Sequence, residues 1–484
     1  MRLVPDLGTL RKLFRPGCVI PVRLEVQADT ETPVSAFLKL SQRETHAFLF
    51  ESVEGGEHSA RWSFLGVHPR RVISWSLGDR GDPLKTMQRE LSRFRGVRIE
   101  GAPRFAGGWV GYIAYDAVPL YEPKVPVSKP DELGFPDVLL MDFGTVLAFD
   151  NVRHTVQVIS EVVWSEGVEA AQAYQKASRR ISSVLRALRR PVVAPKPARA
   201  SRPARLKPRV RRAVFEAAVR RARELICAGD CQQIVLSQRF DAQTSVPPFE
   251  LYRALRRVNP SPYLFYLQAG ERALIGSSPE TLVRLEAGEV TVRPIAGTRP
   301  RGRTPAEDAR LEAELCADPK ENAEHMMLVD LGRNDVGRVA RVGSIKVDFL
   351  RTVERYSHVM HLVSQVRGRL ENGLGSLDVL RAAFPAGTVT GAPKVRAMEI
   401  IDQLEPARRG PYAGAVGYFD RYGNMEMCIV IRTLLQSGRR VSAQAGAGVV
   451  YDSRPVSEYR ETCNKARALF VAIAEAEAFR RSPR

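Results

Sequence analysis

The chain has 484 residues, which exceeds one ordinary hydrophobic core, so we expect two or more lobes or one large composite domain. Hydrophobic residues make up 44% and charged residues 26%, the composition of a soluble globular protein. No segment approaches the roughly 18 consecutive apolar residues of a membrane span, and residues 1–20 lack the apolar core of a signal peptide. We therefore predict a cytoplasmic protein that does not bind membranes.

The net charge of +19 raises the question of nucleic-acid binding. The excess of basic residues is concentrated between Lys176 and Arg221, where Glu216 is the only acidic residue. Much of this stretch is Pro-rich and has no aromatic residue on which a base could stack, so it is typical of a semi-extended linker over residues 191–210. We expect no nucleic-acid partner.

The first 190 residues predict mainly strands, because short apolar runs alternate with polar residues and end at Gly, Pro or Asp. A charged helix over Val168–Leu188 ends this part, and the strands lack regular intervening helices, which favours an antiparallel α+β arrangement. The predicted strands are residues 46–53, 61–67, 70–77, 107–115, 138–150 and 154–160.

Beyond the linker, a helix is predicted over Arg211–Ala228, with Gly229 ending it. Short strands follow, and two further helices are predicted at Asp318–Arg338 and Pro455–Ala478. The cysteines are scattered through the chain, which fits free thiols.

Each of the last two helices carries carboxylates on one face. Glu321 and Glu324 are three residues apart in one, and Glu458 and Glu461 are three residues apart in the other. If the two faces meet, four carboxylates converge and need a cation between them. All-oxygen ligands favour Mg²⁺ over zinc. The alternative, two solvated helix faces, stays open at this stage.

A candidate anion site lies near the second helix. Gly446 and Gly448 allow backbone N–H groups to approach a ligand closely, and Arg432 and Lys465 offer charged partners. The glycines do not match a phosphate loop or a dinucleotide fingerprint. The residues therefore indicate an anionic small molecule bridged to Mg²⁺.

A series of motifs resembles the chorismate-utilising enzymes in order and spacing over residues 211–484. The motifs are PIAGTRPRG, DPKENAEHMMLVDLGRNDVGRV, VMHLVS, FPAGTVTGAPK, GPYAGAVGYF, IRT and AGAGVVYDSRPVSEYRETCNKA. The segments LFES and RWSFLG in the first half are similar to the anthranilate synthase branch of this family. The resemblance implies an α+β fold, a layered antiparallel β-sandwich core flanked by helices, to which both halves contribute.

The resemblance implies conversion of chorismate and ammonia to anthranilate and pyruvate, the amination step of tryptophan biosynthesis, with Mg²⁺ as cofactor. Glu280 would protonate the departing C4 hydroxyl, and His361 and Thr388 would serve pyruvate loss. The implied metal carboxylates are Glu321, Glu324, Glu458 and Glu461. The implied substrate-binding residues are Ala296, Gly297, Thr298, Tyr412, Arg432, Gly446, Ala447, Gly448 and Lys465.

Two positions separate the branches of the family. Ala296 stands where covalent aminodeoxychorismate synthases have a lysine, and Gln233 stands where isochorismate synthases have the lysine that activates water. Without either lysine, ammonia is the natural nucleophile. The alternative branch is the para-aminobenzoate one, whose product keeps its pyruvyl group.

The resemblance also implies a tryptophan feedback pocket and a separate glutamine amidotransferase subunit that supplies ammonia. Phe50 and Leu264 depart conservatively from the usual leucine and methionine of the feedback segments. We thus predict a regulatory region at 1–190, a linker at 191–210 and a catalytic region at 211–484. The implied inhibitor-binding residues are Glu51, Ser52, Pro262, Tyr263 and Leu264.

Overall fold

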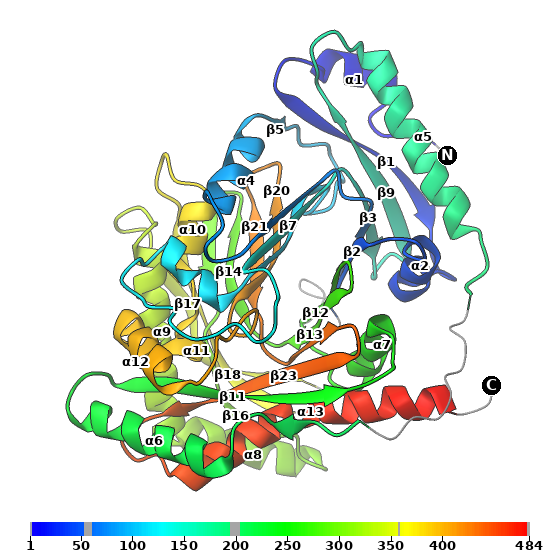
Figure 1. Cartoon of the computed structure of the whole chain (residues 1–484). Coiled ribbons are helices and arrows are strands. Elements are labelled where there is room, and N and C mark those ends of the chain that lie inside the picture. The colour runs from blue at the N-terminus through cyan, green and yellow to red at the C-terminus, as the bar shows by residue number, and fades with distance from the viewer. Residues whose placement is uncertain (1, 53–60, 194–203, 357–358, 482–484) are drawn as a thin grey trace.

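The computed structural model describes residues 2–52, 61–193, 204–356 and 359–481. Residues 194–203 of the predicted linker and Val53 of the first predicted strand lie outside these ranges. Within them, the chain forms two large sheets with helices on their outer faces (Figure 1). The sheets are antiparallel except for one short parallel pair, β1 (Cys18–Gln27) with β5 (Arg95–Gly96). The predicted α+β fold with a layered antiparallel core is therefore confirmed.

The first sheet takes its strands from both halves of the sequence. In spatial order, the strands are β10 (Lys207–Pro208), β11 (Gln233–Gln243), β23 (Arg440–Val449), β22 (Thr433–Ser437), β13 (Arg272–Ser278), β12 (Tyr263–Ala269), β2 (His46–Glu51), β3 (Trp62–Val67), β8 (Thr145–Asp150), β9 (Thr155–Val163), β1 and β5, with β19 (Gly391–Ala392) on β11.

The second sheet also takes its strands from both halves of the sequence. Its order is β16 (Ile295–Pro300), β18 (Val359–Arg369), β15 (Glu289–Val292), β14 (Thr281–Glu286), β21 (Met425–Ile429), β20 (Ala415–Asp420), β6 (Gly108–Ile113), β7 (Val138–Phe143) and β4 (Arg71–Trp75), with β17 (Lys346–Arg355) on β18. The two halves are joined directly where β2 pairs with β12 and β6 pairs with β20.

Helices cover the outer faces of both sheets (Figure 1). They are α1 (Leu7–Leu13), α2 (Pro33–Leu40), α4 (Pro83–Ser92), the 3₁₀ helix η1 (Tyr115–Leu120), α5 (Ala170–Leu188), α6 (Arg212–Cys227), α7 (Pro248–Val258), α8 (Pro305–Ala317), α9 (Pro319–Gly337), α10 (Ser376–Ala383), α11 (Gly387–Thr390), α12 (Lys394–Leu404) and α13 (Pro455–Arg481). Between the sheets, buried side chains from both meet, as in the Phe48–Phe143 ring contact at 4.8 Å.

Several apolar runs that look continuous in sequence pass from one sheet to the other. Residues 138–150, predicted as one strand, form β7 and β8, and the chain turns at Gly144, where any side chain would collide with Arg70. The strand pairs β13/β14 and β21/β22 cross between the sheets side by side, since β13 pairs with β22 and β14 with β21. Glu280 and Arg432 lie at these two crossings.

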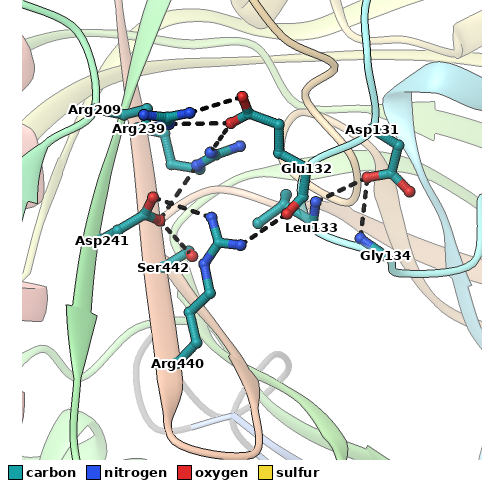
Figure 2. Close-up of polar contacts among 9 residues, drawn as sticks. All are labelled: Asp131, Glu132, Leu133, Gly134, Arg209, Arg239, Asp241, Arg440 and Ser442. Atoms are coloured by element: carbon teal, nitrogen blue, oxygen red, sulfur yellow. Dashed lines mark hydrogen bonds and ion pairs between the residues drawn. The ribbon is translucent and has the colours of Figure 1, made fainter.

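An ion-pair network fixes the loop between η1 and β7 to the first sheet (Figure 2). Glu132 accepts hydrogen bonds from Arg209 at 2.9 and 3.1 Å and from the buried Arg239, and Arg440 donates to the Glu132 carbonyl at 2.8 Å and pairs with Asp241. The Arg209 hydrogen bonds and the Arg239 charge lower the pKa of Glu132 to about 2. The network therefore stabilises the folded state only while Glu132 is ionised.

We expect Glu132→Gln to lower the free energy of unfolding by about 2 kcal/mol at pH 7, because the buried Arg239 loses its charged acceptor. The folded-state pKa of Glu132 lies below its ordinary value of 4.5, so this contribution is present above about pH 4.5 and is lost as pH falls toward 2. Urea unfolding of the parent and the variant at pH 7 and pH 3 measures this difference in the free energy of unfolding. Glu314→Gln, in the exposed Arg310–Glu314 pair, is the control and should change stability by less than about 0.5 kcal/mol. An equal effect of both variants would contradict the prediction.

Candidate active site

Both predicted carboxylate helices are present. Asp318 caps α9, accepting hydrogen bonds from the backbone N–H groups of Lys320 and Glu321, and α9 then presents Glu321 and Glu324. Pro455 begins α13, which presents Glu458 and Glu461. The helix predictions are confirmed to within a few residues.

The carboxylates of the two helices influence one another. Burial raises the pKa of Glu324, and the charges of Glu321 on its own helix and Glu461 on α13 raise it further. Burial also raises the pKa of Glu458, with Glu461 adding to it. The acidic faces of the two helices therefore share one electrostatic environment.

Cations lie beside two of these acids. Glu321 pairs with Arg299 at 3.2 Å, and Glu461 pairs with Lys465 at 2.6 Å. Among the residues that the structure describes, no three acidic, histidine or cysteine side chains are close enough together to coordinate one ion. The set offers only carboxylate oxygens, which are the ligands that Mg²⁺ prefers. The donor chemistry thus fits Mg²⁺.

His325 does not belong to the acidic face, although it is only one residue from Glu324. It is fully buried, and its Nε2 lies 2.6 Å from the Ser364 hydroxyl on β18. Burial, with a smaller contribution from Arg351, lowers the pKa of His325. It is a neutral core residue that joins α9 to the second sheet.

Glu280 occupies the crossing between β13 and β14. Burial raises the pKa of its carboxyl to about 7, although Thr388, Lys465 and Arg432 all act to lower it. Thr388 stands beside it on α11, and a hydrogen bond from the Thr388 hydroxyl is the largest of the influences that lower this pKa. A carboxyl that is half protonated at neutral pH is suited to donate a proton.

Arg432 occupies the neighbouring crossing, between β21 and β22. Burial lowers its pKa, while Tyr412, Glu280 and Glu461 act to raise it. Its backbone is in the left-handed region, with φ of 51°. In the part of the chain that the structure describes, it forms no ion pair within 4.0 Å. A desolvated cation held in a strained conformation without a partner is a candidate anion-binding group.

The glycines of β23 lie opposite site residues. A Cβ at Gly446 would come within 2.8 Å of the Tyr412 hydroxyl, and a Cβ at Gly448 within 2.4 Å of the Gln233 Nε2. Lys465 donates to the Gly446 carbonyl at 3.1 Å. Ala447 points to the opposite face of the strand and is fully buried, so only its backbone is available to the site. Small residues here leave space for these side chains and for a ligand.

Gln233, at the start of β11, is 4% exposed, and its Oε1 has no hydrogen-bond partner among the described residues. Burial raises the pKa of Tyr412 to about 12, so its hydroxyl stays protonated and can donate to an anion. Both side chains thus offer hydrogen-bonding groups next to β23.

His361 lies on β18 opposite Thr298 of β16. Its Nδ1 is 3.0 Å from the Gly297 carbonyl and 3.0 Å from the Thr298 hydroxyl. A carbonyl can only accept, so Nδ1 carries the proton and Nε2 keeps its lone pair. Burial lowers the pKa of His361, which keeps the ring neutral and able to act as a base at neutral pH.

The segment of β16 also connects to the acidic helix. A Cβ at Gly297 would lie 3.3 Å from Glu321 Oε2, and Ala296 pairs with Leu362 next to a bulge. Arg299, in the same motif, pairs with both Asp318 and Glu321. Arg299 was not among the predicted site residues, although the sequence places it directly after PIAGT and before the acidic helix.

The five predicted inhibitor-binding residues line one pocket, which shares none of the predicted substrate residues. Aromatic side chains, including Trp62 and Phe64, form much of its wall. Ser52 Oγ is buried with no hydrogen-bond partner among the described residues. The Tyr263 hydroxyl lies 2.7 Å from the hydroxyl of Thr281, the residue after Glu280, so the pocket borders the candidate active site.

Comparison with known proteins places the chain in a family. The model of the chorismate binding enzymes matches residues 45–471, and the chain belongs to this family. It is 46% identical to anthranilate synthase component 1 of Pseudomonas putida over 477 residues, covering 95% of this chain and 96% of the relative. Nothing in the described residues forms a helix long and apolar enough to cross a membrane.

Two solved structures share the fold. Anthranilate synthase component I of Streptococcus pneumoniae superposes with a TM-score of 0.77 and 37% identity, covering 92% of this chain and 99% of the other. The menaquinone-specific isochorismate synthase of Escherichia coli gives a TM-score of 0.72 at 22% identity, covering 96% and 98%.

Proposed function

We propose that this chain is the aminating subunit of an anthranilate synthase, which converts chorismate and ammonia to anthranilate, pyruvate and water. The observation that carries this proposal is the half-buried Glu280 carboxyl, with a pKa of about 7, beside Arg432, which forms no ion pair with any described residue. A proton donor next to an anion-binding group suits the loss of a hydroxyl from a carboxylated substrate. The 46% identity to an anthranilate synthase component 1 supports the branch.

The cationic and amide groups around β23 would bind the two carboxylates of chorismate. Arg432 supplies a charge that forms no ion pair within the described part of the chain, and Lys465 and the Tyr412 hydroxyl supply further donors. Because Glu280 is itself neutral when protonated, it does not repel this dianion. The substrate is thus bound against a proton donor without like-charge repulsion.

In the first step, Glu280 would protonate the C4 hydroxyl as it leaves the ring as water, while ammonia adds to the ring. The described site residues include no lysine at the positions of Ala296 and Gln233, so ammonia meets no competing amine from those positions and no lysine base that would activate water. In the second step, Nε2 of the neutral His361 would remove a ring proton as pyruvate departs and the ring becomes aromatic.

Glu321, Glu324, Glu458 and Glu461 would hold Mg²⁺. When bound, the ion neutralises the charge of the substrate ring carboxylate, which the acidic faces would otherwise repel. Arg299 and Lys465 now neutralise two of these acids, so they are the groups that would give way to the ion. We expect chelation by EDTA to remove activity and added Mg²⁺ to restore it.

Ammonia would come from a separate glutamine amidotransferase subunit, in keeping with the name component 1 carried by the relatives. The alternative product, aminodeoxychorismate, retains its pyruvyl group. Mass spectrometry of the product formed from chorismate, Mg²⁺ and an ammonium salt separates the two. Anthranilate with an equal amount of pyruvate supports the proposal, whereas a pyruvyl-bearing product would move the chain to the para-aminobenzoate branch.

The aromatic pocket that contains Ser52 would bind tryptophan as a feedback inhibitor. Its aromatic wall suits an indole, and the Ser52 hydroxyl, which has no hydrogen-bond partner among the described residues, offers a hydrogen bond to the ligand's charged groups. Binding there would act on Glu280 through Tyr263 and Thr281.

We expect Ser52→Ala to raise the tryptophan concentration for half-inhibition about tenfold, because one hydrogen bond to a charged ligand group is lost. The measurement is anthranilate formation over a tryptophan titration of the parent and the variant. Leu264→Met, which restores the usual family residue, is the control for a change of shape alone. Unchanged inhibition of Ser52→Ala would show that tryptophan does not bind at this hydroxyl.

A further inference from the structure

Arg409 is a buried arginine three residues before Tyr412, with 1% of its side chain exposed. Its Nε and Nη2 donate to the Glu405 carboxylate at 2.9 and 2.6 Å. Its Nη1 donates to the Val389 carbonyl at 2.7 Å, and its Nη2 also donates to the Val235 carbonyl at 2.7 Å. One guanidinium thus joins three separate segments of the chain.

Each of these segments carries a candidate site residue. Val389 follows Thr388 in α11, and Val235 of β11 lies opposite Gly448 of β23. Glu405 accepts hydrogen bonds from the backbone N–H and the hydroxyl of Ser237, at 2.7 and 2.8 Å. Ser237 lies opposite Gly446.

The guanidinium also contacts two tyrosine rings. Its Cζ lies 4.6 Å from the centre of the Tyr115 ring and 5.7 Å from the centre of the Tyr412 ring. Tyr115 belongs to η1 in the first half, and its backbone N–H donates to the Gly410 carbonyl at 3.0 Å. The Asp116 carboxylate accepts from the Gly410 N–H at 2.6 Å. The first half therefore holds the segment that carries Tyr412.

We propose that Arg409 is a positioning residue for chorismate: with Glu405 it holds Tyr412, the Thr388 helix and the β11/β23 glycine segment in one geometry. We call Arg409 and Glu405 the Arg409 clamp. The inference rests on the proposed function, because Tyr412, Thr388 and the glycines are its substrate-facing groups. Arg409 donates from its Nε, Nη1 and Nη2 to protein acceptors, and it acts through these residues.

A plain structural role predicts a different response to lysine. If only the buried charge pair mattered, lysine would keep the pair with Glu405 and largely preserve the protein. A lysine has one nitrogen and cannot donate in the planar fork that reaches Glu405, Val235 and Val389 together. If Arg409 is a positioning residue, we therefore expect the Arg409→Lys variant to fold but to bind and convert chorismate poorly.

The test compares Arg409→Lys and Arg409→Met with Arg421→Lys. Arg421 is also buried and pairs with Asp142 at 2.5 Å and Glu161 at 3.4 Å, but it lies at the far end of β20 from Tyr412. We expect Arg409→Lys and Arg409→Met to lower kcat/KM for chorismate about 30-fold and to raise the calorimetric Kd of chorismate about tenfold. Arg421→Lys should stay within about twofold in both, at a similar loss of Tm.

The proposal is overturned if Arg409→Lys binds and turns over chorismate within about twofold of the parent, or if Arg421→Lys loses function equally. Should both Arg409 variants fail to fold, Tyr115→Leu replaces them, because the Tyr115 hydroxyl has no hydrogen-bond partner among the described residues. It should fold and lower kcat/KM about threefold, and an unchanged value would overturn the proposal. If the parent protein binds chorismate but forms no anthranilate, the proposed reaction is wrong. The Arg409 clamp can still be tested in that case, through the Kd of chorismate for the parent and the variants.

Discussion

Glu280→Gln should lower kcat for anthranilate formation about 10³-fold while the Kd for chorismate changes by only a few fold. Glutamine fills the same buried space and can still donate a hydrogen bond, but it cannot transfer a proton to the departing hydroxyl. Stopped-time assays of anthranilate, with calorimetric chorismate binding, separate the two quantities. A variant that keeps more than about a tenth of the parent kcat would show that another group is the acid.

The pH dependence gives an independent check on Glu280. Burial raises the pKa of this carboxyl to about 7, and the acid must be protonated to act. At a fixed concentration of free ammonia, kcat/KM of the parent should be constant below pH 7 and fall about tenfold per unit above it. Glu280→Gln should lack this break, and a parent profile that rises through pH 7 to 8 at fixed ammonia would contradict the assignment.

Arg432→Gln should raise KM for chorismate about 100-fold without lowering stability, because it removes a desolvated cation whose proposed binding partner is the substrate. Without ligand, the cation has no ion pair within 4.0 Å among the described residues and occupies a strained backbone conformation. Its loss therefore costs binding and leaves the folded state intact.

Steady-state kinetics and thermal unfolding of the same Arg432→Gln preparation test this. Arg408→Gln is the matched control, since Arg408 lies four residues before Tyr412 and its Nε donates to the Lys129 carbonyl at 3.0 Å, away from the candidate substrate groups. It should leave KM within about twofold. A lower Tm for Arg432→Gln with unchanged KM would make Arg432 a structural residue.

The elements themselves were predictable where the chain signals them locally. Asp318 followed by Pro319 marked the start of α9, and alternating apolar residues marked β2, β3, β9 and β12. The pairing of strands was not predictable in detail. β2 pairs with β12, which lies more than 200 residues away, and no sequence feature of either strand specifies its partner. The hydrophobic pattern of the sequence shows no break where the chain crosses between the sheets at Glu280 and at Arg432. The sequence alone therefore did not predict that these two residues lie close together.

The site residues were predictable as a set, and their geometry was not. Resemblance named Glu280, and only the structure shows the burial that raises its pKa to about 7. The acidic faces of α9 and α13 were predicted to meet, whereas their ion pairs with Arg299 and Lys465 depend on side-chain positions. Arg409 was passed over because a sequence does not reveal that a single arginine reaches Glu405, Val235 and Val389.

The most direct test of chorismate amination is the fluorescence of anthranilate formed by the purified chain alone. The chain is given chorismate and Mg²⁺ with either an ammonium salt or glutamine as nitrogen source. We predict a signal that grows with ammonium, disappears with EDTA and is absent with glutamine, because in the proposed function ammonia is the nucleophile and a separate subunit supplies it. Consumption of chorismate under the same conditions without anthranilate would contradict the proposed function.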